Sequence, residues 1–247
     1  MSAPALPAPR STAPGWTGPL WHVLAALSTA GFLATLGLTF AYAPVEAQMG
    51  IVQKIFYLHV PAAQAMYIGF TVAAVGGFMV LYRPSERWEA LCVAGAEVGM
   101  LFCAIVLVTG PLWGRKAWGA YGWWDPRLTS TLLTGLLYRA FLSLRGSGTA
   151  GAVEKRSAAA LALVSFPMLF LIKFSVARWQ GQHPQVVTGE GQGLAPAMYP
   201  AFVVGLVTSV LLVAWLLWAR YRVERTRQAV ARLEMDAAER GLLEEVY

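Results

Sequence analysis

Long apolar runs separated by short polar segments dominate the pattern of this chain. Six runs stand out, and each is long enough to cross roughly 30 Å of hydrocarbon as a helix. We expect them at Leu20–Tyr42, Ile55–Tyr82, Trp88–Leu112, from the end of a tryptophan-rich stretch to Leu144, at Ser157–Val176 and at Met198–Ala219. The fourth run is the shortest. The pattern predicts an all-α polytopic membrane protein with six transmembrane helices.

The segments outside the six runs differ in composition and suggest three regions. Residues 1–19 are rich in Pro and Ala and are predicted to be a disordered tail. Residues 20–219 form the six-helix membrane domain. Residues 220–247 are predicted to be a charged cytoplasmic helix, with Arg232 and Asp236 spaced for an i,i+4 pair and an apolar seam that includes Val230 and Leu233. A solvated tail and a docking helix both remain open for this last region.

Positive charge sets the expected orientation. With the N-terminus in the cytoplasm, thirteen of the 19 Lys and Arg residues fall on the inner side and six on the outer side. The bias places both termini in the cytoplasm and the tryptophan-rich loop outside. The outer cations are Lys54, Arg115, Lys116, Arg127, Lys173 and Arg178.

Composition supports the membrane class and limits other functions. The chain is 57% hydrophobic and only 13% charged, whereas soluble domains carry about 25% charged residues. A net charge of +6 could indicate nucleic acid, but the cations are spread between apolar runs, which argues against it. Cys92 and Cys103 lie about 16 Å apart along one helix, too far for a disulfide, and are expected to be small core residues.

Two of the three histidines and an unusual aromatic cluster fall on the predicted outer side. His59 lies at the outer start of the second run, His183 precedes the sixth, and "WGAYGWWDPRLTS" at 118–130 lies between them. Haem requires axial imidazoles, an apolar platform and basic groups for its propionates. A lone histidine is more often a polar residue at an interface, and tryptophans often form a belt at the membrane surface. The concentration of both on one side favours a haem site.

Other residues in and near the cluster suggest local roles. Asp125 is placed to cap the fourth helix, with Pro126 at its first position. Two histidines without clustered Cys or carboxylate make a poor zinc site, and no hydrolytic triad or phosphate loop is present. Glu97 lies within the third run, where an ionisable group normally has a purpose, as a structural hydrogen-bonding group or in a polar path.

These motifs resemble those of the CcmC family, the haem exporter protein C branch of the WWD-domain proteins of cytochrome c maturation. "FYLHVPAA", the tryptophan-rich stretch and "WQGQH" occur in the family's order over about residues 20–219. The resemblance implies His59 and His183 as axial ligands of haem iron. Its signature matches Trp118, Gly119, Trp124, Asp125, Arg127 and Leu128. Tyr121, Gly122 and Trp123 depart from the family pattern as a rearranged aromatic cluster, so that either Tyr121 or Trp123 could face the porphyrin.

The resemblance also implies a function. Such proteins hold haem b as cargo at the periplasmic face of the bacterial inner membrane and present it to a haem chaperone, CcmE. An ABC-type pair, CcmA and CcmB, and a small membrane protein, CcmD, are the other implied partners. The implied role is therefore haem delivery and not catalysis. A haem transporter that moves haem across the bilayer and a CcsA-like cytochrome c synthetase are the alternatives.

Overall fold

A computed structural model describes residues 18–119, 125–146, 151–179 and 194–241. Within these ranges the chain folds into α-helices and short helical turns, and the sole β-pairing is an isolated bridge between Glu46 and Gly50. The helices are α1 (Pro19–Gly37), α2 (Phe56–Tyr82), α3 (Glu86–Trp118), α4 (Pro126–Gly146), α5 (Ala152–Ser165), α6 (Pro167–Trp179) and α7 (Tyr199–Glu239). The predicted N-terminal tail lies almost entirely outside the described residues.

Five segments of this helical fold are long and apolar enough to cross a membrane. They are Pro19–Tyr42, Ile51–Tyr82, Glu86–Lys116, Ala152–Ser175 and Pro196–Glu239. The chain is therefore an all-α protein with the character of a multi-pass membrane protein. The fourth predicted span exists as α4, a helix of 21 residues, but Arg139, Arg145 and several hydroxyl side chains lower its hydropathy. Six spans and cytoplasmic termini remain predictions.

The predicted fifth span is not one continuous helix. α5 ends at Ser165 and α6 starts at Pro167, with a turn at Phe166 between them. Proline has no backbone N–H and its ring crowds the preceding turn, so a helix commonly stops before it. The amide of Phe166 instead bonds the Leu163 carbonyl, and the Ser165 hydroxyl donates to the Leu161 carbonyl at 2.7 Å.

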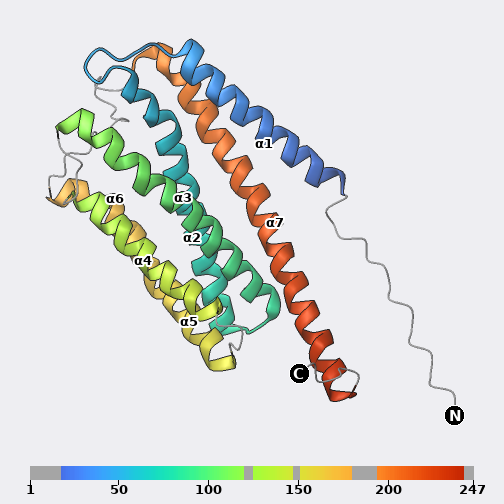
Figure 1. Cartoon of the computed structure of the whole chain (residues 1–247). Coiled ribbons are helices and arrows are strands. Elements are labelled where there is room, and N and C mark those ends of the chain that lie inside the picture. Colours follow the sequence, from blue (N-terminus) through green and yellow to red (C-terminus); the bar gives the residue numbers. More distant parts are fainter. Residues whose placement is uncertain (1–17, 120–124, 147–150, 180–193, 242–247) are drawn as a thin grey trace, which may run out of the picture.

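The helices lie side by side with α2 and α3 at the centre (Figure 1). α4, α5 and α6 pack together along one side of this pair, and α7 packs along the other. α1 lies on the outer side of α7, which is its main contact. Successive helices reverse direction, except that α6 continues the course of α5. The start of α2, the end of α3 and the starts of α4 and α7 therefore share one end of the molecule. We call it the His59 end.

Small residues allow α2 and α3 to approach very closely. A Cβ on Gly69 would stand 2.6 Å from the Gly99 Cα, and one on Gly95 would stand 2.4 Å from the Ala73 nitrogen. A Cβ on Gly76 would meet the Cys92 backbone in the same way. Helices in membranes associate largely through such backbone packing, since lipid tails provide no hydrophobic drive between them. This contact fixes the register of α3 against α2.

The two cysteines are small core residues, as predicted. Cys92 and Cys103 are free and buried, with exposed fractions of 2% and 0%. The sulfur of Cys103 packs closely against Gly135 of α4, because a Cβ added to Gly135 would lie 3.1 Å from it. Both side chains fill positions between α3 and its neighbours.

α7 continues well past the point where the last apolar run ends. The predicted charged helix at the C-terminus is the direct continuation of the sixth span, without a break from Tyr199 to Glu239. In this extension Arg225 and Arg232 both pair with Glu86 at the start of α3, at 3.0 and 2.6 Å. Arg232, whose expected partner was Asp236, is thus held by a residue of another helix.

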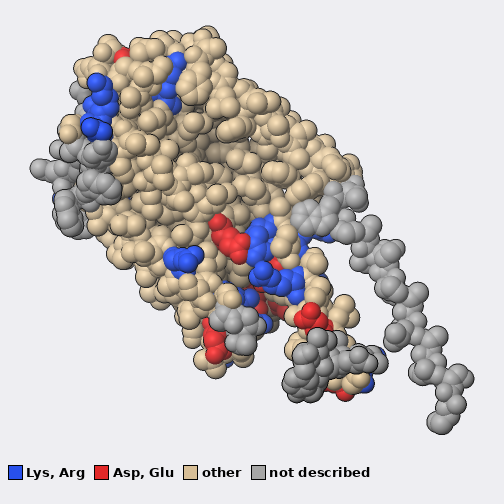
Figure 2. Space-filling model, viewed as in Figure 1, with Lys and Arg blue, Asp and Glu red and all other residues tan. Residues whose placement is uncertain are grey.

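The opposite end of the bundle carries a mixed cluster of charges, and we call it the charged end. On the face in Figure 2, uncharged surface separates a few cations at the His59 end from acidic and basic side chains gathered along the lower part of the molecule. The cluster joins four helices through these residues: Glu89, Glu97, Arg145, Lys155, Arg220 and Glu224.

Candidate functional site

His59 lies in the first turn of α2, directly after a 3-10 turn at Ile51–Ile55. It is buried, with 5% of its surface exposed. Its Nδ1 lies 2.7 Å from the hydroxyl oxygen of Thr109 on α3. Of the histidines predicted to bind iron, this is the one that the structure describes, and it faces the α2–α3 contact.

Aromatic side chains surround His59. The ring of Trp113, one turn beyond Thr109, lies 5.8 Å from the imidazole ring and 5.9 Å from the ring of Phe56. Phe56 stacks on Phe202 of α7 at 5.1 Å. The Trp113 indole N–H donates to the Met49 sulfur at 3.3 Å. Trp113 is 2% exposed, so it belongs to a core and not to a belt of tryptophans in contact with lipid headgroups.

A hydrogen-bonded turn at Glu46 shapes the loop between α1 and α2. Glu46 accepts hydrogen bonds from the amides of Gln48 and Met49, at 2.9 and 2.5 Å. These bonds keep the pKa of the exposed Glu46 carboxyl below its ordinary value of 4.5, with Met49 as the largest cause. The turn places Met49 under Trp113, and so connects this loop to the surroundings of His59.

Lys54 was predicted to be an outer-loop charge, but it lies inside the protein. It is 5% exposed, and its ammonium group donates to the carbonyls of Thr39, Phe40 and Ala43 at 2.8, 3.3 and 3.2 Å. Those carbonyls end the π-helical turn that follows α1 and have no helical partner beyond it. A lysine provides three donors, and here each finds an acceptor. Lys54 thus ties the end of α1 to the start of α2.

Gly110 brings His59 close to the start of α4. A Cβ at Gly110 would lie 3.4 Å from Cε1 of His59 and 3.7 Å from Cδ1 of Leu128. The imidazole and the first turn of α4 therefore meet at the same point of α3. The second predicted motif, which continues to Leu128, converges with the first at this position.

Asp125 caps α4 as predicted. Its carboxylate accepts from the amides of Arg127 and Leu128 at 2.9 and 3.2 Å, and Pro126 occupies the first helical position. This is the usual bond from an Ncap side chain to the N2 and N3 amides. The side chain is 9% exposed. The observed role of Asp125 is therefore to start the helix, and this orients Arg127.

Arg127, at the same end, has a buried N–H donor that lacks an acceptor among the described residues. This donor is the Nε of its guanidinium group. A buried guanidinium N–H without an acceptor costs free energy, roughly 1–3 kcal/mol. An anionic group that reaches this nitrogen from outside the chain would relieve that cost.

The remaining predicted site residues are described in part or not at all. Gly119 ends α3 with a φ of +74°, a left-handed conformation that favours glycine. Trp118 is the last residue of α3, and its side chain lies outside the described part. His183, Tyr121, Trp123 and Trp124 lie outside the described residues.

Sequence reasoning missed Thr109 and Gly110, two residues of α3 that lie directly against His59. A Thr–Gly pair in an apolar run carries no chemical signature by itself. The available signal was positional: both precede Pro111 and Trp113 at the end of the third run, just before the tryptophan-rich loop. That position puts them at the same end as His59 in any antiparallel pairing of the second and third runs.

Glu97 has a structural partner at the charged end. Arg220 of α7 bonds both carboxylate oxygens of Glu97, and it also bonds Glu224 at 3.2 Å. Glu97 is therefore part of the ion-pair cluster at this end.

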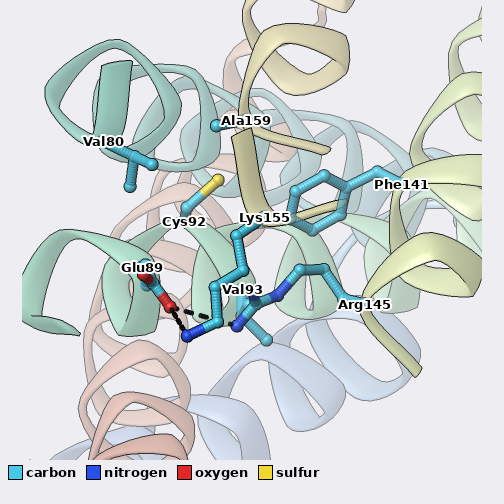
Figure 3. A pocket seen from close by; sticks show the side chains of 8 residues that line it. All are labelled: Val80, Glu89, Cys92, Val93, Phe141, Arg145, Lys155 and Ala159. Carbon is cyan, nitrogen blue, oxygen red and sulfur yellow. Dashed lines mark ion pairs between the residues drawn. The ribbon is translucent and has the colours of Figure 1, made fainter. Parts of the chain in front are cut away.

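A small pocket at the same end is lined by charges that are already paired. Figure 3 shows Arg145 and Lys155 beside Cys92, both directed at the carboxylate of Glu89, and the two ion pairs measure 3.5 and 3.1 Å. The cations of this pocket are thus paired with acids of the chain.

Comparisons with known proteins agree on one family. The family model described as heme exporter protein C matches residues 6–236, beyond both limits of the 20–219 core in which the motifs were recognised. A heme exporter protein C of Bradyrhizobium diazoefficiens is 33% identical over 202 residues, covering 81% of this chain and 77% of that protein. The Rhodobacter capsulatus heme exporter protein C is 30% identical over 222 residues, covering 87% and 89%.

Proposed function

The chain belongs to the heme exporter protein C (CcmC) family, and we propose that it binds haem at its His59 end and presents it to a haem chaperone. The family places the chain in haem handling for cytochrome c maturation. The observation that carries the location is the convergence of His59 and the first turn of α4 on Gly110. An imidazole, an aromatic core and a half-buried cation, Arg127, lie within that one region.

The residues at this end suit haem chemically. His59 supplies an imidazole for iron, and Phe56 and Trp113 supply apolar aromatic surface around it. Arg127 supplies a buried Nε that needs an acceptor, which a propionate carboxylate would provide. Haem b is the cargo of this site and is released in the form in which it was bound. The protein therefore acts in delivery and not as an enzyme.

His183 is the proposed second axial ligand. Its segment follows α6, which runs antiparallel to α4 and so ends near the start of α4. The described chain resumes at Leu194, which packs against the core cluster of Phe56 and Trp113. Both attachment points of the segment thus belong to the His59 end. Trp118, Gly119, Tyr121, Trp123, Trp124 and Asp125 form the remaining proposed wall of the site.

The proposed setting follows from the charge bias and the family. The His59 end faces the periplasm of a bacterial inner membrane, and the acceptor is a CcmE-like chaperone. CcmA- and CcmB-like ABC subunits and a CcmD-like protein complete the assembly. The chain supplies placement and orientation of the haem, which lowers the barrier to its transfer.

The absorption spectrum of the purified protein tests the ligands. Haem bound to the wild type is expected to show a six-coordinate b-type spectrum, altered in both His59→Ala and His183→Ala. His22→Ala is the matched control, since His22 is an exposed residue at the start of α1. If neither ligand variant changes the spectrum, the proposed ligands are wrong.

Transport across the bilayer is the second candidate, and the break between α5 and α6 is the observation that favours it. Transporters commonly use discontinuous helices to form a binding site at the midplane. Here the polar groups at the break are bonded within the chain, which favours presentation. Haem supplied only outside sealed vesicles separates the two functions. A presenter still loads the chaperone from that side, whereas a transporter becomes dispensable.

A further inference from the structure

Thr109 holds the side chain of His59 through a hydrogen bond whose direction can be deduced. The hydroxyl oxygen lies 2.7 Å from His59 Nδ1, and the same hydroxyl donates to the Ile105 carbonyl at 2.7 Å. A hydroxyl has one hydrogen, and a carbonyl oxygen can only accept. The hydrogen of Thr109 is therefore used on Ile105, and its oxygen accepts from His59.

This direction decides which nitrogen of the neutral imidazole carries the proton. Nδ1 must be the donor, so the neutral ring is the Nδ1–H tautomer. The lone pair of that tautomer lies on Nε2. A metal binds the nitrogen that carries the lone pair, and the bond made by the other nitrogen sets both tautomer and ring orientation.

Neighbours on the same face of α3 restrict the ring further. Gly110 packs against Cε1, the carbon between the two nitrogens, since a Cβ there would be in van der Waals contact with it at 3.4 Å. Trp113 stands 5.8 Å away at an interplanar angle of 58°. The ring is therefore held on one edge by Thr109 and packed by the residues one and four positions after it.

We propose that Thr109 is a positioning residue for haem, which fixes His59 as the Nδ1–H tautomer so that Nε2 is the nitrogen offered to iron. The proposal rests on the proposed function for its iron step, but the tautomer is a property of the haem-free protein. By accepting a hydrogen bond from Nδ1–H, Thr109 also raises the basicity of the ligand nitrogen.

Two variants at one position separate the hydrogen bond from the shape of the side chain. Thr109→Val keeps the branched shape and removes the hydroxyl, while Thr109→Ser keeps the hydroxyl. Thr134→Val is the matched control, because the buried Thr134 hydroxyl also donates to a carbonyl four residues earlier, at 2.8 Å, on α4. All three are made in the full-length chain.

The first readout needs no haem. Nitrogen-15 shifts of histidine-labelled protein distinguish protonated from unprotonated ring nitrogens, and His59→Ala identifies the His59 signals. The wild type, Thr109→Ser and Thr134→Val are expected to show Nδ1–H. Thr109→Val is expected to show a mixture of tautomers. An Nε2–H tautomer in the wild type would overturn the proposal, whatever the protein does with haem.

The second readout uses haem itself. Loss of a residue that orients a metal ligand typically weakens binding by about 10- to 100-fold. Thr109→Val is expected to weaken haem binding in this range and to shift the reduction potential of the bound haem, with Thr109→Ser close to wild type. If His59→Ala changes the spectrum and Thr109→Val changes neither affinity nor potential, Thr109 has no positioning role and the proposed function stands. If His59→Ala has no effect, the proposed function and the iron step both fail, and the tautomer result still reports on the hydrogen bond.

Discussion

Gly69 on α2 and Gly99 on α3 lie so close that a Cβ on Gly69 would come within 2.6 Å of the Gly99 Cα. This contact belongs to a series of small residues along the two helices. It brings the backbone of α3 near enough for the Thr109 hydroxyl to reach His59. The proposed site therefore depends on helix packing several turns away from it.

Gly95→Val is expected to destabilise the protein strongly. Its Cβ would lie 2.4 Å from the Ala73 nitrogen, which is backbone and cannot rotate away, so the helices must separate. Overpacking costs about 1–3 kcal/mol or more. Thermal unfolding in detergent measures the loss. Gly37→Ala is the control, because no atom lies within 4 Å of its added Cβ, and it should be neutral or slightly stabilising. Equal effects of the two variants would contradict the close contact.

Lys54→Met should destabilise the junction of α1 and α2. It removes three hydrogen bonds and leaves buried carbonyls of Thr39 and Ala43 without a donor. An unsatisfied buried group costs roughly 1–3 kcal/mol. Unfolding in mixed micelles is the measurement, with Lys116→Met as the exposed control. A cost no larger than that of the control would show that the ammonium group is not needed there.

Asp125→Ala should weaken the start of α4, and Asp125→Asn should not. Asparagine can still accept from the amides of Arg127 and Leu128, whereas alanine cannot. Loss of such a cap costs about 1 kcal/mol. Unfolding free energies and haem affinity are measured on both variants. If haem affinity falls equally in both while only the alanine variant is less stable, the carboxylate charge also contributes to binding.

Glu97 and Arg220 should show coupled effects in a double-mutant cycle. Arg220 bonds both oxygens of Glu97 and also contacts Glu224. Because the Glu97 side chain is 36% exposed, solvent screening limits the coupling to about 1 kcal/mol. The cycle uses Glu97→Gln, Arg220→Gln and the double variant, with unfolding as the readout. Additive effects would mean that the pair has no net coupling.

The turn at Glu46 should loosen at low pH. Its carboxyl has a pKa lowered by the amides of Met49 and Gln48, so the stabilisation is present above the ordinary pKa of 4.5. It is lost as the pH falls through the lowered value in the folded protein. The protection of the Met49 amide, meaning its hydrogen-exchange rate relative to the intrinsic rate at the same pH, should therefore fall at acidic pH, and Glu46→Gln should abolish that dependence. An unchanged pH dependence in Glu46→Gln would exclude the carboxylate as the cause.

Sequence reasoning succeeded where rare residue types or strong periodicity carried the information. The apolar runs located the helices, and the position of Asp125 before Pro126 identified it as a helix cap. His59 stood out by its type and position, and its role as an iron ligand stays a prediction. Glu97 was recognisable, but its partner Arg220 is 123 residues away and could not be found without the fold. Lys54 was counted only as an outer-side charge, because composition does not reveal that carbonyls at the end of α1 surround it. Thr109 was missed because its role depends entirely on its contact with another helix.

The unbroken course of α7 gives the two ends of the molecule a mechanical connection. Its first turns pack in the core cluster that contains Phe56 and Trp113, and its last turns extend past the ion pairs with Glu86. A helix of 41 residues is about 60 Å long, and about half of it lies beyond Ala219. A tilt of about 10° would swing the far tip by about 5 Å relative to Ala219, since the helix is a rigid rod at this scale. α7 is thus one continuous rod whose first half contacts the surroundings of His59 and whose second half lies beyond Ala219.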